Sequence, residues 1–189
     1  MRKLTMLGSL ALTGALALAV VGGVGAAQSK KPPTAGKKPP TAGKPSRSAT
    51  PVFKLRLKPN QEVPAIKGLR ADAVGSVTFD LTRNSSGAIT SGDVIFYFNY
   101  AFPGSVTISG LHVHQGAKGA NGGIVVDSGT NEPADADGVG NVTKVVAGAP
   151  ATLEAILRNP RGYYVNLHTT TPNHPAGALR AQLHNPTKR

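Results

Sequence analysis

Cysteine is absent from the 189-residue sequence. Catalysis by a thiol is therefore excluded, as is lipid attachment through an N-terminal cysteine, and an exported form has to fold without disulfides. No serine lies in a Gly-x-Ser-x-Gly elbow, so a hydrolase built on a catalytic triad has no visible nucleophile. After residue 27, no stretch is long and apolar enough to span a membrane.

The first 27 residues have the layout of a secretory signal peptide. Arg2 and Lys3 precede an apolar run that begins at Leu7, and the segment ends in the small residues Ala26 and Ala27. The run is also long enough to cross a bilayer, so an uncleaved membrane anchor is the alternative. We predict cleavage, because glycines near the end of the run suit a peptidase better than a stable helix. The protein is then secreted or extracytoplasmic, in the periplasm or at the cell surface, with no transmembrane segment after signal removal.

Residues 28–50 are rich in lysine and proline and contain no acid. The heptad KKPPTAG occurs twice, at 30–36 and 37–43. Proline pairs block helix and sheet, lysines repel one another and nothing apolar can be buried, so we predict an extended, disordered linker. Two roles stay open for it: contact with an anionic envelope or membrane surface, and a solvated spacer that binds nothing. The basic residues that would make such a contact are Lys30, Lys31, Lys37, Lys38, Lys44 and Arg47.

The formal net charge of +12 is unevenly distributed along the chain. From Pro51 onward there are 13 Lys and Arg against 9 Asp and Glu, which leaves about +4. Most of the excess charge therefore belongs to the N-terminal segments. We predict no specific nucleic-acid partner for the rest of the chain.

From Pro51 onward, apolar residues recur with a period of two, which is typical of strands with one buried face. Eight short strands separated by Gly, Pro, Asn and Asp turns predict an all-β antiparallel sandwich or barrel over residues 51–185, followed by a tail at 186–189. We expect Phe53, Phe79 and Phe96 in its core, and one short helix over an open end. The predicted strands are VFKLRLKP, GSVTFDL, DVIFYFNY, SVTISGLHVH, GGIVVDS, NVTKVV, YYVNLHT and GALRAQLH, and the helix is PATLEAILRN.

Histidine is the one plausible source of unusual chemistry. His112 and His114 form a His-x-His pair on a predicted strand, with both imidazoles on one face and about 7 Å apart along the chain. With His168, at the end of another strand, they form a candidate copper or zinc site. The alternative, which we favour at this point, is that the pair hydrogen-bonds to the neighbouring glycine-rich loop and to the turn near His168.

A second group of polar residues lies on the last two predicted strands. Asn166 and His168 share one face of the first strand, and Arg180 and Gln182 share one face of the second. If the strands pair as a hairpin, these faces meet. Asn166, His168, Arg180 and Gln182 are then expected to form a hydrogen-bonded cluster that supports the fold or exposes a binding face.

Two loops have compositions that resemble ligand sites. The glycine-rich loop, residues 115–123, precedes a strand and lacks the Lys-Ser/Thr pair of a nucleotide cradle, so we predict that its glycines allow positive φ and close backbone approach. Asp127, Glu132, Asp135 and Asp137 follow in a polar loop without the ligand spacing of an EF-hand. A solvated loop is the prediction there, with loose calcium binding as the alternative.

Taken together, four segments resemble the chordin-domain (CHRD) family over Phe53 to Leu183. They are LKPNQEVPAI, GSVTFDL, LHVHQGAKGANGGIVVD and GYYVNLHTTTPNHPAGALRAQL. The resemblance implies a module of exported proteins with an immunoglobulin-like Greek-key sandwich, whose His-x-His strand is similar to that of copper-zinc superoxide dismutase. Two residues depart from the family pattern, in which Ala178 is usually Glu and Ala181 is usually Gly.

These observations lead to two functional hypotheses. The first is a secreted or cell-envelope module that is not an enzyme, has no catalytic residue and no cofactor, and binds an unknown protein or envelope ligand. The second is a copper- or zinc-binding protein, or an oxidoreductase similar to superoxide dismutase, that uses His112, His114 and His168. Metal analysis separates the two hypotheses.

Overall fold

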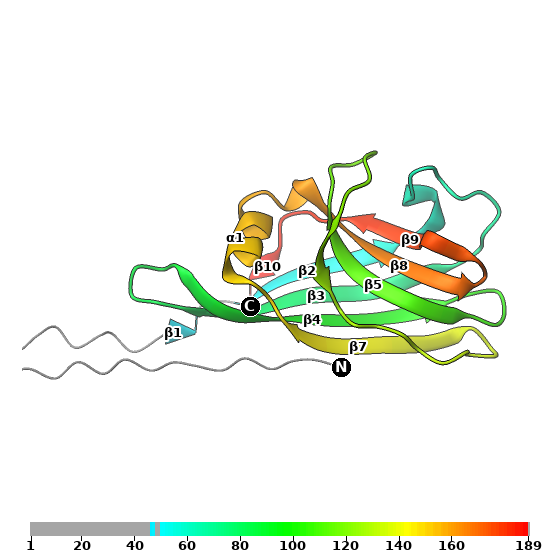
Figure 1. Cartoon of the computed structure of the whole chain (residues 1–189), viewed down its shortest axis with the longest axis horizontal. Coiled ribbons are helices and arrows are strands. Elements are labelled where there is room, and N and C mark those ends of the chain that lie inside the picture. The colour runs from blue at the N-terminus through cyan, green and yellow to red at the C-terminus, as the bar shows by residue number, and fades with distance from the viewer. Residues whose placement is uncertain (1–45, 48–49, 189) are drawn as a thin grey trace, which may run out of the picture. The chain divides into compact units, whose positions relative to one another are not determined.

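The computed structural model describes residues 46–47 and 50–188. Two antiparallel sheets stack face to face (Figure 1). The first runs in the order β10-β2-β3-β4-β7, with β1 also paired to β3, and the second in the order β6-β5-β8-β9. The first sheet comprises β1 (Ser46–Arg47), β2 (Pro51–Leu57), β3 (Asp72–Arg83), β4 (Ile89–Ala101), β7 (Val139–Ala147) and β10 (Thr187–Lys188). The second comprises β5 (Thr107–Gln115), β6 (Ile124–Asp127), β8 (Tyr163–Thr171) and β9 (His174–Gln182). The all-β sandwich predicted from the alternation is confirmed.

The core lies between the two sheets, where the alternation placed it. Phe53, Phe79 and Phe96 are fully buried, and the rings of Phe53 and Phe79 meet edge to face at 5.3 Å between centroids. Strand β4 lies inside its sheet, between β3 and β7. Its outer face is nevertheless open to solvent, because Tyr97 is 46% exposed.

Helix α1 (Pro150–Arg158) packs against β4, and its Leu153 and Ile156 are fully buried. Leu153 lies so close to Gly92 that a Cβ added there would be 2.8 Å from its Cδ1. Two 3-10 turns, η1 (Pro59–Gln61) and η2 (Pro160–Gly162), complete the described elements. No helix in the described part of the chain is long and apolar enough to cross a membrane.

The predicted segments at the two ends of the chain are described only in part. The signal segment 1–27 and most of the linker 28–50 lie outside the described residues. Ser46 and Arg47, which we assigned to the disordered linker, form β1 and pair with β3. Thr187 and Lys188, assigned to the tail, form β10 and pair with β2. These short strands pair with backbone groups that β2 and β3 leave unpaired. Sequence periodicity does not reveal such pairing.

The outer face of the second sheet is polar, although its inner face belongs to the core. On β8, Val165 and Leu167 are fully buried in the core, so the alternating Asn166 and His168 point to the other side. The glycine-rich loop, residues 115–123, connects β5 to β6 and lies beside this outer face (Figure 1).

Candidate metal centre

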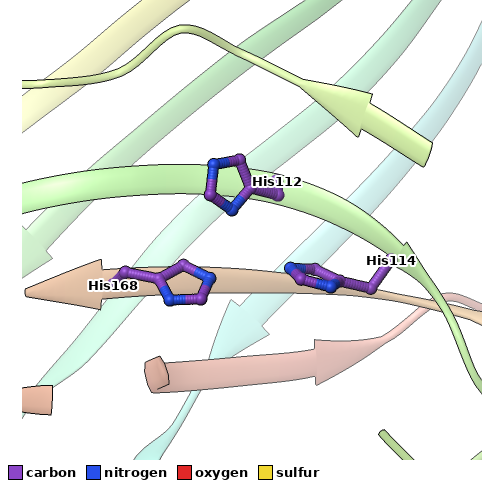
Figure 2. Close-up of side chains that lie close together, drawn as sticks. All are labelled: His112, His114 and His168. Atoms are coloured by element: carbon purple, nitrogen blue, oxygen red, sulfur yellow. The ribbon is translucent and has the colours of Figure 1, made fainter. Parts of the chain in front are cut away.

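Three histidines meet on the outer face of the second sheet. His112 and His114 come from β5 and His168 from β8, and their rings face one another (Figure 2). One ligand nitrogen from each lies within 4.8 Å of those of the other two. The ring centroids are 4.8 Å apart for His112 and His168, 5.5 Å for His112 and His114, and 5.7 Å for His114 and His168.

Strand register brings His168 to the His-x-His pair. Gly110 on β5 lies opposite His168 on β8, two residues before His112. The absence of a side chain at position 110 leaves room for the His112 ring, because a Cβ there would be 2.6 Å from its Cε1. Glycine at this position is therefore part of how the sequence builds the cluster.

The second nitrogen of each ring is engaged by an oxygen acceptor. His114 donates from Nδ1 to the carbonyl of Gly122 at 3.0 Å, and His168 donates from Nδ1 to the carbonyl of Pro175 at 2.9 Å. Nε2 of His112 lies 3.3 Å from Oδ1 of Asp127. A carbonyl oxygen only accepts hydrogen bonds, so Nδ1 of His114 and Nδ1 of His168 have to carry the hydrogen.

These two hydrogen bonds set the tautomer of neutral His114 and His168, and the nearby carboxylate of Asp127 favours hydrogen on Nε2 of His112. Their remaining nitrogens, Nδ1 of His112, Nε2 of His114 and Nε2 of His168, present lone pairs. All three are buried and have no hydrogen-bond partner among the residues that the structure describes. Buried acceptors that lack a partner are costly, and three of them grouped together require an explanation.

The surroundings keep the three imidazoles neutral. Burial lowers the pKa of His112, His114 and His168, in each case as the largest cause. Repulsion from His168 lowers the pKa of both His112 and His114 further, and the charge of Arg180 also lowers that of His114. A neutral imidazole with a free lone pair is the form that binds a metal ion.

The spacing of the three nitrogens is close to that of a metal site. Zinc binds histidine nitrogen at about 2.0–2.1 Å, so two ligands of a tetrahedral ion are about 3.3 Å apart. The three ligand atoms lie within 4.8 Å of one another, so the longest pair has to approach by about 1.5 Å. The second nitrogens already have the acceptors that bound histidines use.

Residues 53–183 match the family described as CHRD domain. The chain belongs to the CHRD domain family. The match covers most of the described residues and agrees with the resemblance drawn from its motifs. No curated protein and no solved structure matches the chain.

The predicted polar residues of this CHRD domain lie on paired strands. Asn166 is opposite Arg180 in the β8–β9 register. We expected these two side chains to form hydrogen bonds with one another and with His168 and Gln182. Among the described residues they instead bond to other partners. Asn166 donates to Glu62, Arg180 to the glycine-rich loop, and Gln182 to backbone carbonyls such as that of Gly116. Side chains this long reach the loops above the sheet, which strand pairing does not predict.

The two departures from the family pattern are buried. Ala178 is fully buried and Ala181 is 4% exposed. Ala178 provides no carboxylate on β9. The acid that interacts with the polar face of β8 in this chain is Glu62, which accepts from Nδ2 of Asn166 at 2.9 and 3.0 Å through its two oxygens.

Sequence reasoning missed three residues that shape the site of this CHRD domain. Glu62 is buried, and its burial raises its pKa to about 7 against the lowering effects of Arg180 and Asn166. Asp127, assigned to a solvated acidic loop, holds His112. Tyr164 stacks on His114 with 4.9 Å between centroids and 8° between planes. Asp127 is the last residue of β6, which pairs with the His-x-His strand, and its place in the predicted strand GGIVVDS was the one available signal.

Proposed function

We propose that this CHRD domain binds one zinc or copper ion through His112, His114 and His168. The observation that supports the proposal is that three histidines, each with a buried and unpartnered ring nitrogen, cluster with one nitrogen of each within 4.8 Å of the others. In His114 and His168 the other nitrogen donates to a backbone carbonyl, and in His112 it lies beside the carboxylate of Asp127, as in the outer shell of metal-bound histidines. A merely structural histidine cluster has no reason to leave its free lone pairs together.

The donor set favours zinc or copper over the alkaline-earth ions. Imidazole nitrogen suits zinc and copper, whereas calcium and magnesium require oxygen ligands. Three protein ligands leave a fourth position for water or another small ligand, unlike the closed sites of structural zinc. We therefore assign the site to metal binding or carriage by a module outside the cytoplasm. The signal-like residues 1–27 support that location.

Metal content of the purified full chain tests this proposal. The protein is expressed in medium containing zinc or copper, and its metal is measured by inductively coupled plasma mass spectrometry. We expect about one ion per chain, and less than about a fifth of that in His112→Ala, His114→Ala and His168→Ala. The matched controls are His174→Ala and His184→Ala, which remove the two histidines outside the cluster and should retain the metal.

Circular dichroism of each variant shows whether the fold is retained. A wild-type protein that contains no zinc or copper and takes up neither on titration would refute the proposal. Equal metal loss in the control variants would also refute it, because binding would then depend on histidine in general.

A further inference from the structure

Arg180 on β9 is a buried cation whose side-chain hydrogen bonds all go to one loop. Its side chain is 2% exposed and has no carboxylate within salt-bridge distance among the described residues. It donates to Oδ1 of Asn121 at 2.9 Å, and to the carbonyls of Ala120 at 2.8 Å and Ala117 at 3.3 Å. Burying a guanidinium is costly, so a residue used in this way has to stabilise something specific. Here that is the conformation of the glycine-rich loop.

The loop held by Arg180 supplies the acceptor for His114. The carbonyl of Gly122 accepts from Nδ1 of His114, and the backbone nitrogen of Gly122 donates to the hydroxyl of Tyr164 at 3.3 Å. A side chain at Gly122 would collide with the carbonyl oxygen of Gln115, so the loop closes tightly over the end of β5. If the loop moved away, Nδ1 of His114 would lose its acceptor.

Arg180 also acts on His114 through an aromatic stack. Its Cζ lies 3.4 Å from the centroid of the Tyr164 ring, a cation–π arrangement. The same ring is parallel to the imidazole of His114. Arg180 therefore restrains two contacts of His114, the one at Nδ1 and the one on its face.

The other two histidines have supports that Arg180 does not touch. Asp127 holds His112, and the backbone of Pro175 holds His168. A loss of Arg180 should consequently affect one of the three rings and leave the other two as internal references.

We infer that Arg180 is a positioning residue for the metal site, which it serves by fixing the tautomer and orientation of His114 through the glycine-rich loop and Tyr164. The consequence for metal affinity rests on the proposed metal-binding function. The claim about His114 itself does not, because it concerns the metal-free protein. Lysine cannot replace this role, because an ammonium group lacks the planar fork of donors and the flat surface for stacking.

The test measures histidine tautomers in the metal-free full chain by long-range ¹H–¹⁵N correlation, followed by zinc titration calorimetry. In wild type we expect His114 and His168 with hydrogen on Nδ1 and His112 with hydrogen on Nε2. In Arg180→Lys we expect His114 to become a mixture of tautomers while His112 and His168 are unchanged. Zinc affinity should fall by about 10- to 100-fold.

Two further variants keep the test decisive. Asn121→Ala removes one acceptor of Arg180 at an exposed position, so it should fold even if Arg180→Lys does not, and it should shift the His114 tautomer in the same direction. Lys118→Ala, the matched control, removes an exposed loop cation that has no side-chain hydrogen bond or ion pair in the described structure, and it should change neither readout. An unchanged His114 tautomer in both Arg180→Lys and Asn121→Ala overturns the inference, and so does an equal change in all three histidines. A wild-type chain with the expected tautomers but no zinc binding would refute the proposed function alone.

Discussion

Glu62 should make the stability of this domain fall as the pH rises through neutrality. The carboxyl is 8% exposed and its pKa is raised from 4.5 to about 7, chiefly by burial. Folding therefore favours its protonated form. The contribution to stability is fully present below pH 4.5 and is lost as the pH rises through about 7.

The size of the effect follows from the shift in pKa. At about 1.4 kcal/mol per unit, a shift from 4.5 to about 7 corresponds to about 3 kcal/mol. Glu62 also lines a cavity of about 450 Å³ with Arg180 and Lys118, so screening by solvent reduces this figure. We therefore expect about 2 kcal/mol between pH 4.5 and 8.

Glu62→Gln removes the ionisation and retains an acceptor for Asn166. We expect the variant to be more stable than wild type by about 2 kcal/mol at pH 8, with the difference declining toward pH 5. Urea unfolding of both proteins in the presence of a chelator, at half-unit pH intervals, measures this difference in stability.

The histidines act in the opposite direction, because their lowered pKa values make stability decline as the pH falls below 6.5. They are common to both proteins and cancel in the difference. A difference that is constant with pH would refute the reasoning.

Two other predictions concern the metal site and the N-terminal cations. Asp127→Asn should weaken zinc binding by about 10- to 100-fold in calorimetry, because an amide is a poorer partner for Nε2 of His112 than a carboxylate. An unchanged affinity would mean that Asp127 does not support the site. For the segment before the domain, deletion of residues 28–45 should abolish retention on anionic phospholipid vesicles, and raising salt from 0.05 to about 0.5 M should do the same to the undeleted chain. Retention that survives both treatments would show that those lysines are not the contact.

The sequence predicted the fold well because its signals are local. Two-residue alternation identified the eight longer strands and the buried phenylalanines, and apolar residues at helical spacing identified the helix near Leu153. The same alternation placed His112 and His114 on one face. It did not reveal β1 and β10, because two-residue strands have no periodicity and depend on the edge that they meet.

The candidate site was only half predictable from the same patterns. The sequence by itself determined which residues share a face, since side-chain direction depends on strand parity alone. Tertiary structure decided which strands are neighbours and in what register they pair. This pairing places His168 beside His112 and His114, which lie more than 50 residues earlier in the chain. It also placed an oxygen beside the second nitrogen of each ring: the carbonyl of Gly122 at His114, the carbonyl of Pro175 at His168 and the carboxylate of Asp127 at His112. These partners come from one loop and two neighbouring strands, and contacts between distant segments depend on the packing of the whole domain.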